Sequence, residues 1–444
     1  MIKHIRVLVA AAMIGALQVV PAAAQGLIRD AEIENTIRAY ATPIFSAAGL
    51  DADSVRIHLV ANDQLNAFVA GGQRLFVYTG LLMEAEEPGE VIGVIAHEAG
   101  HIAGGHLARI QEELRNAQIK SILSFVLGAV AGVATGDGRV AGAITTAGQG
   151  EAVGGLLKYS RTQESAADAA GLKYLDRTGQ SSRGIYTFLQ RLQDQMFMSG
   201  IRVSPYLSTH PLTTERINAV ANHLSLSRYT DAAEKPEFLA AHQMMRAKLI
   251  GFTRSLQATL RSYPESDLSV PARYARAIAW YRQPDLMRAS ALVDGLIAEQ
   301  PKNPYFHELK GQMLLESGRI ADSIPPYQKS VELAPGEPLL ETALAKAQLE
   351  TNDPALVDTA REHLESAVQG EPGLGSAWRL LTVAYSRLER PGETALAQAE
   401  YSLILGERNQ AQALAERAMG VLPQGSPGWL RAQDITTQVK RDKS

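Results

Sequence analysis

The spacing of apolar residues early in the chain changes from a helical period to an alternating one. Residues 28–50 carry isoleucines at helical intervals among charged side chains, which predicts an amphipathic helix. Residues 55–60 then alternate between polar and apolar, as in a half-buried strand. Two further strands are predicted at residues 66–69 and 74–78, around a Gly71-Gly72 turn. This part of the chain is therefore expected to build a small sheet beside a helix.

The last third of the chain is rich in Ala, Leu and Glu and has the period of a helical repeat. Pro301 and Pro335 lie 34 residues apart, which is the period of the tetratricopeptide repeat (TPR). Counting from these prolines predicts four degenerate repeats over about residues 266–435. The stretch 225–265 keeps apolar spacing and is expected to be a connecting helical segment.

These patterns predict a mainly α chain with more than one folded domain. About 420 residues exceed what a single hydrophobic core usually organises. The expected organisation is an α+β domain with a small β-sheet over residues 25–262, followed by an all-α TPR solenoid over residues 263–444.

Residues 1–24 have the three parts of an export signal. Lys3 and Arg6 precede an apolar run of 14 residues, and a small-residue cleavage site follows before Gln25. The chain contains no cysteine, which suits the oxidising bacterial periplasm. The mature protein is therefore expected to begin at Gln25 and to be periplasmic.

The charge of the chain argues against a nucleic-acid partner. Removal of the signal changes the formal net charge from −4 to −6, because Lys3 and Arg6 leave with it. No run of basic residues indicates binding to nucleic acid.

A second apolar stretch lies at residues 119–134 and is followed by a segment rich in Gly and Ala. Two interpretations stay open for 119–157. It can form a helical hairpin packed on the core, or a hairpin that makes peripheral contact with a membrane surface. The apolar run is short for a membrane span.

The pentapeptide His97-Glu98-Ala99-Gly100-His101 carries the clearest chemical signal. Two histidines four residues apart on a helix project from one face, about 6 Å apart along the axis, and can share one Zn²⁺. Glu98 lies between them, where a carboxylate can take a proton from attacking water. Without cysteine, the other ligands must be histidine or carboxylate. One zinc ion per chain is expected.

Two downstream positions compete to complete the metal site. In the pattern HExxHxxGxxH, Leu107 occupies the third-ligand position, and His106 comes one residue early. His106 could reach the metal only if the helix broke at Gly104-Gly105, so an outer contact or a packing role is expected for it. Glu164 is the better ligand, because Asp168 lies one helical turn later and faces the same way. Asp168 could then accept the free N–H of a ligand histidine.

Together these motifs resemble gluzincin peptidases, specifically the family that includes the CAAX prenyl proteases, the heat-shock membrane protease HtpX and the BepA-type periplasmic proteases with TPR repeats. The resemblance covers nearly the whole mature chain. It rests on the TPR tail and on four motifs: Asn66-Ala67-Phe68 with Gly71-Gly72, Tyr78-Thr79-Gly80-Leu81-Leu82, His97 to His101, and Glu164 to Asp168. It implies an α+β gluzincin protease domain in a periplasmic protein. The implied site has His97, His101 and Glu164 as zinc ligands and Glu98 as the base.

His210 is the remaining candidate. It precedes Pro211 in a segment that resembles a loop entering a helix. In BepA-type proteins the corresponding histidine can reach the zinc and occlude the site, which implies a latent enzyme if His210 is a fourth ligand. Otherwise His210 can stabilise the oxyanion of the tetrahedral intermediate, or it is a structural residue at a turn. The sequence leaves these alternatives open.

The predicted function is that of a periplasmic zinc endopeptidase that degrades misfolded or misassembled proteins. An extended substrate is expected to add a strand beside Asn66, Ala67, Phe68, Val69 and Ala70, because backbone pairing recognises unfolded chain without demanding a sequence. The TPR array offers a surface for a partner, and the resemblance implies the outer-membrane protein assembly machinery. The alternative is a chaperone or assembly scaffold with a largely latent protease site plugged by His210.

Overall fold

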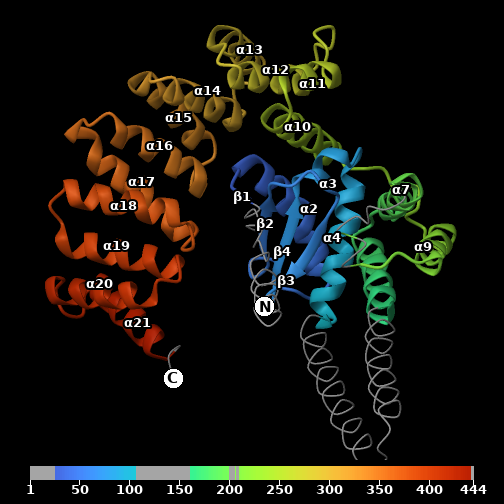
Figure 1. Ribbon diagram of the computed structural model, residues 1–444, viewed down its shortest axis with the longest axis horizontal. Helices are drawn as coiled ribbons and strands as arrows, with labels where there is room; N and C mark the ends of the chain where they lie inside the picture. Colours follow the sequence, from blue (N-terminus) through green and yellow to red (C-terminus); the bar gives the residue numbers. More distant parts are fainter. Residues whose placement is uncertain (1–25, 107–160, 200–205, 207–209, 442–444) are drawn as a thin grey trace, which may run out of the picture. The chain divides into compact units, whose positions relative to one another are not determined.

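The computed structural model describes residues 26–106, 161–199, 206 and 210–441 (Figure 1). The predicted signal peptide at 1–24 and the predicted hairpin within 119–157 lie outside the described residues. In the part of the chain that is described, no helix is long and apolar enough to cross a membrane.

The described chain forms two compact units. The first contains the residues up to Arg29 together with Ile37–Leu239, and the second contains Asp30–Thr36 and Ala240–Ser444. The division of function between a protease domain at 25–262 and a repeat domain at 263–444 stays a prediction.

The first part of the chain holds a small sheet and several helices. The strands are β1 (Leu27–Ile28), β2 (Arg56–Val60), β3 (Ala67–Ala70) and β4 (Arg74–Tyr78). The helices are α2 (Ala31–Ala47), α3 (Thr79–Glu84), α4 (Pro88–Ala103), α7 (Arg183–Ser199) and α9 (Thr214–Leu226). A further helix, whose described part covers residues 161–177, is called the 161–177 helix below.

The three predicted strands are present as β2, β3 and β4. The sheet has the order β1-β2-β4-β3, in which β2 and β4 are parallel and β3 is antiparallel to β4. The expected helix at 28–50 begins later, because the side chain of Asp30 accepts a hydrogen bond from the backbone N–H of Ile33 and starts α2. Residues before Asp30 are therefore free to pair with β2, and the strand β1 was not predicted.

Helix α4 is buried along nearly its whole length and lies beside the sheet (Figure 1). Pro88 occupies its first turn, where a missing backbone N–H costs nothing, and Glu90 complements the helix dipole. Val91, Val94 and Ile95 are almost fully inaccessible to solvent. This packing gives a rigid support to any side chain that α4 carries.

The second unit is built from helices. They are α10 (Pro236–Thr253), α11 (Leu256–Ser262), α12 (Val270–Arg282), α13 (Leu286–Glu299), α14 (Pro304–Glu316), α15 (Ile320–Leu333), α16 (Pro338–Glu350), the 3₁₀ helix η1 (Pro354–Leu356), α17 (Val357–Gly370), α18 (Gly375–Arg387), α19 (Pro391–Ile404), α20 (Arg408–Val421) and α21 (Pro427–Arg441). The connecting helical segment expected at 225–265 is present as α10 and α11 together with the end of α9.

Helices α12 to α21, called the repeat array below, run as five successive pairs rather than the four repeats that were predicted. The first helices of the first three pairs begin 34 residues apart, as the proline spacing indicates. The count failed because Gly406, not a proline, follows the fourth pair, whereas Pro423 lies between the two helices of the fifth. The predicted fold class is nonetheless confirmed: the chain is mainly α, with a small sheet followed by helical repeats.

Candidate active site

Helix α4 presents two histidines from the same face. The Nε2 atoms of His97 and His101 lie 3.1 Å apart, and both side chains are buried. Four residues span slightly more than one helical turn, so the two side chains project from the same face of α4. Their rings contact each other edge to face. Their ring nitrogens converge as the HExxH spacing predicts.

Glu164 reaches the two histidines from the 161–177 helix. This helix packs so closely on α4 that a Cβ atom at Gly100 would lie 2.7 Å from the carbonyl oxygen of Ala167. The Oε2 atom of Glu164 lies 3.3 Å from His97 Nε2, and its Oε1 atom lies 3.3 Å from His101 Nε2. The close approach of the two helices thus brings the carboxylate between both imidazoles.

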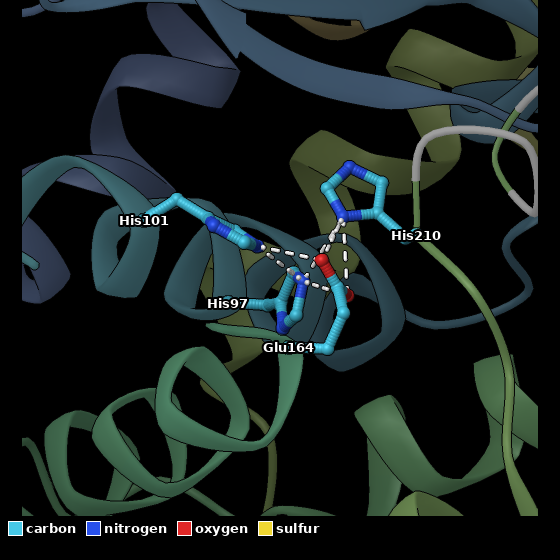
Figure 2. Close-up of side chains that lie close together, drawn as sticks. All are labelled: His97, His101, Glu164 and His210. Atoms are coloured by element: carbon cyan, nitrogen blue, oxygen red, sulfur yellow. Dashed lines mark hydrogen bonds and ion pairs between the residues drawn. The ribbon is translucent and has the colours of Figure 1, made fainter. Parts of the chain in front are cut away.

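His210 joins the cluster from the segment before α9 (Figure 2). Its Nδ1 atom lies 3.2 Å from Glu164 Oε1 and 3.4 Å from His97 Nε2. The ring packs against the ring of Tyr206, with centroids 4.6 Å apart. One ligand atom each from His97, His101, Glu164 and His210 can be chosen so that all lie within 4.8 Å of one another.

Asp168 and Arg216 contact the cluster from its outer side, at His97 and Glu164. Asp168 Oδ1 lies 2.8 Å from His97 Nδ1, the ring nitrogen that faces away from the other histidines. Arg216 donates two hydrogen bonds to the Asp168 carboxylate, at 2.6 and 2.9 Å, and its Nη1 lies 2.9 Å from Glu164 Oε2. The sequence predicted the contact of Asp168 with a histidine but gave Arg216 no role.

Neighbouring charges shift the pKa values of His97 and Asp168. Burial disfavours the charged form of His97, but the Asp168 carboxylate outweighs burial and raises the pKa of His97 to about 9. Burial would raise the pKa of Asp168, yet hydrogen bonds from Arg216 and His97 lower it to about 2. Asp168 is therefore an ionised and strong acceptor for the His97 N–H.

The groups that face the centre of the cluster have altered pKa values too. Burial lowers the pKa of His101 and of His210, which favours neutral rings with a free lone pair. Burial acts to raise the pKa of Glu164, but hydrogen bonds from the three histidines hold it well below its usual range. Neutral imidazoles and an ionised carboxylate are the forms that bind a metal, so His97, whose pKa is raised, would release its Nε2 proton when a metal binds.

Glu98 lies next to the cluster but outside its donor set. Its carboxylate is fully buried, and its Oε1 atom is 3.4 Å from His210 Nε2. Burial raises the pKa of Glu98 to about 7, against the opposing effect of His101 and His97. A carboxyl group that titrates near neutrality is suited to exchange protons in a reaction.

The strand proposed to receive substrate lies at the edge of the sheet and contacts α4. The backbone N–H of Tyr78 donates to the carbonyl of Asn66, and bonded pairs alternate along an antiparallel ladder. Phe68 and Ala70 therefore bond to β4, whereas the N–H and carbonyl groups of Ala67 and Val69 face away from β4, and the N–H of Val69 acts to lower the pKa of the Glu98 carboxyl group.

The residues present fit a metal ion, and the chemistry of the donor set favours zinc. Two imidazole nitrogens and one carboxylate converge from two helices, and the chain offers no thiolate. A set of two histidines and one glutamate is typical of catalytic zinc sites. His210 is a possible fourth donor by position, whereas His106 lies on the far side of His101.

A helix with the HExxH motif and a glutamate from a second helix together define a metallopeptidase. Residues 28–224 match Peptidase family M48. The chain is a metalloprotease, and the region that matches this family contains the HExxH helix and Glu164.

Two bacterial relatives match both parts of the chain, and a mitochondrial one matches less than half of it. Over 410 residues it is 27% identical to the beta-barrel assembly-enhancing protease of Yersinia pestis, a match that covers 88% of this chain and 81% of that protein. The protease of the same name from Escherichia coli K12 is 24% identical, over 90% of this chain and 81% of its own. The mitochondrial metalloendopeptidase OMA1 of Saccharomyces cerevisiae is 31% identical over 194 residues, 42% of this chain and 52% of its own.

Among solved structures, YrrB, described as a TPR protein with an unusual peptide-binding site, aligns with 39% of this chain and 91% of its own. The TM-score is 0.32 and the sequence identity is 14%.

Proposed function

We propose that this chain is a zinc-dependent endopeptidase whose active site is the cluster around His97, His101 and Glu164. The observation that carries the proposal is the convergence of buried donor atoms beside the buried carboxylate of Glu98. His97, His101 and Glu164 would hold one zinc ion. When bound, zinc would supply a Lewis acid that polarises the scissile carbonyl and makes water easier to deprotonate.

Glu98 is proposed as the general base. It accepts a proton from the attacking water and passes it to the leaving amine. A pKa of about 7 in the metal-free cluster supports this role, because the charge of a nearby cation lowers that pKa and leaves the group ionised at neutral pH. Asp168 holds His97 with its Nε2 lone pair toward the cluster and Arg216 holds Asp168, so both act by positioning.

The substrate is proposed to bind as an extended chain along β3. The N–H and carbonyl groups of Ala67 and Val69 face away from β4, on the side of Glu98, where another strand could pair with them. Because α4 contacts this strand, a peptide paired with residues 66–70 would pass near Glu98. Backbone pairing suits a protease for misfolded chains, whose sequences have little in common.

His210 is proposed as a latency switch. A fourth protein ligand would close the coordination sphere, and closed zinc sites are usually structural rather than catalytic. The position of His210 Nδ1 near Glu164 and His97 supports this role. A displaced His210 would admit water and substrate. The same position supports the rival function, a chaperone or assembly scaffold whose protease is mostly inactive.

The proposed setting is quality control of outer-membrane proteins in the periplasm. The names of the relatives from Yersinia pestis and Escherichia coli, which describe proteases that enhance beta-barrel assembly, support it. The predicted signal peptide agrees with this location. The repeat array is proposed to recruit the assembly machinery or a misassembled client, because stacked helix pairs form extended binding surfaces.

The decisive test of the catalytic proposal is Glu98→Gln. Glu98→Gln is expected to keep its zinc and its fold but to lose cleavage of an unfolded substrate such as casein. Glu90→Gln is a matched control, because Glu90 is a buried glutamate of the same helix that bonds Arg191 and lies outside the cluster. Turnover by Glu98→Gln near that of the control would exclude Glu98 as the base.

A further inference from the structure

The chain turns at the end of α4 and places a further histidine, His106, next to the cluster. The helix ends at Ala103, and Gly105 has a φ of 62°, a left-handed conformation that glycine adopts without strain. On an unbroken helix, His106 would lie about 140° around the axis from His101. Instead its side chain is buried, with a relative exposure of 6%.

His106 contacts the outer nitrogen of His101. The two Nδ1 atoms lie 3.0 Å apart, and the rings are nearly perpendicular, at 81° with centroids 5.0 Å apart. The other nitrogen of His101, Nε2, faces His97 and Glu164. His101 thus bridges the ligand cluster on one side and His106 on the other.

We propose that His106 is a positioning residue that fixes the tautomer and orientation of His101 for metal binding. This inference rests on the proposed zinc site. Two facing ring nitrogens at 3.0 Å must be one donor and one acceptor. A ligand histidine must keep the Nε2 lone pair free, so His101 carries its proton on Nδ1 and donates it to His106 Nδ1. His106 then carries its own proton on Nε2.

The opposite assignment works against metal binding. If His106 donated, the proton of His101 would sit on Nε2, among the donor atoms of the cluster. His106 therefore excludes the wrong tautomer by acting as an acceptor. Asp168 does the same for His97 at 2.8 Å, so each ligand histidine has its own outer acceptor.

The structure also holds His106 in place. The side chain of Gln163 donates a hydrogen bond to the carbonyl oxygen of His106 at 3.2 Å, and Gln163 is itself buried. Gln163 directly precedes Glu164 in the 161–177 helix. The same helix thus supplies a ligand and anchors the backbone of the residue that orients another ligand.

The test compares His106→Asn with His106→Leu in the full-length mature protein. The two new side chains have nearly the same shape, but only asparagine keeps an acceptor. Zinc affinity is measured by competition with a chromophoric chelator, and the melting temperature of each metal-free variant is recorded. His106→Leu is expected to bind zinc about 10–100-fold more weakly, the usual effect of losing such an outer partner. His106→Asn is expected to stay close to wild type.

His223→Leu serves as the control, because His223 is a half-buried histidine of the same unit that contacts Asp176 instead of the cluster. It should bind zinc as the wild type does. If His106→Leu does not fold, His106→Phe keeps a ring without an acceptor and should show the same loss. Equal loss in the Asn and Leu variants, or wild-type affinity in Leu, would overturn the inference. Failure of the wild type itself to bind zinc would instead refute the proposed metal site.

Discussion

Arg216 shows how one buried side chain can hold several parts of a site. Besides its contacts with Asp168 and Glu164, its Nη1 donates to the carbonyl oxygen of Pro211 at 3.1 Å. Pro211 directly follows His210, so Arg216 also fixes the segment that brings this histidine into the cluster. Removal of a buried ion-pair partner leaves uncompensated charge, which typically costs about 3–5 kcal/mol.

Replacing His210 by alanine separates its possible roles. If His210 occupies a coordination position, His210→Ala should raise basal cleavage of casein, with zinc retained through His97, His101 and Glu164. If it stabilises the oxyanion, the same change should lower activity by about 10²–10³-fold. Initial rates at matched zinc content decide between them. Unchanged activity would leave His210 a structural role only and contradict both readings.

At the residue scale, the sequence predicted which side chains share a helix face, because that follows from local spacing. His97, His101, Glu164 and Asp168 lie at helical intervals, so the sequence alone placed each pair on one face. The role of Arg216 was not predicted, because its contacts join segments 48 residues apart. Nothing in its local sequence marks this arginine as buried. The one sequence signal for Arg216 is its place in the first turn of the helix that follows the His-Pro segment.

Strand β3 is the element whose edge should matter most for activity. Val69→Pro removes the N–H of Val69 without removing a bond to β4, and edge strands tolerate proline. Because this N–H also acts on the Glu98 carboxyl group, kcat and KM are measured separately. Loss of one backbone hydrogen bond to the substrate should raise KM for an unfolded substrate by about 2- to 10-fold. Val69→Ala, which keeps the N–H, should retain activity. Equal kinetics in both variants would argue against pairing of substrate with this edge.

In the second unit, α10 and α14 contact each other around one buried lysine. The Lys248 ammonium lies 2.8 Å from Asp30, 3.2 Å from Glu32 and 3.6 Å from Glu308. One cation faces three carboxylates, and burial raises the pKa of Glu308 to about 7 despite the attraction of Lys248. When all three are ionised, the carboxylates outnumber the single cation and leave an excess of negative charge.

This excess predicts a pH dependence of stability. Glu308 binds its proton more tightly in the folded state, so its contribution is greatest below its ordinary pKa of 4.5 and declines as the pH rises to about 7. The second unit should melt at a higher temperature at pH 5 than at pH 8. In calorimetry, Glu308→Gln should flatten this slope, whereas Gln at the exposed Glu332 should not. An unchanged slope in Glu308→Gln would contradict the assignment.

At the element scale, helices and strands with a clear local period were predicted correctly. The predictions failed where the end of a helix determines how the next elements pair. Strands β2 to β4 and the helices of the array follow from spacing alone. The fifth repeat pair was missed because Gly406 ends its predecessor without a proline. The break at Gly105 was recognised as a condition for His106 to approach the site, but sequence spacing could not show which nitrogen of His101 it would contact.

At the scale of the whole molecule, the chain combines a region that matches Peptidase family M48 with a repeat array in one polypeptide. The relatives named for beta-barrel assembly match across both parts, whereas OMA1 matches over less than half of this chain. The proposed division of labour is chemistry in the first part and recruitment in the second. The sequence predicted this combination because the metal motif and the repeat period are independent local signals.

The most direct test of the account is to locate the metal in crystals of the mature protein by anomalous scattering at the zinc absorption edge. One zinc ion per chain is expected, bound by His97 Nε2, His101 Nε2 and Glu164, and no such ion is expected in crystals of Glu164→Ala. The same map shows whether His210 is a fourth ligand. A wild-type crystal grown with zinc that holds no ion between these residues, or a Glu164→Ala crystal with full zinc occupancy, would contradict the proposed zinc site.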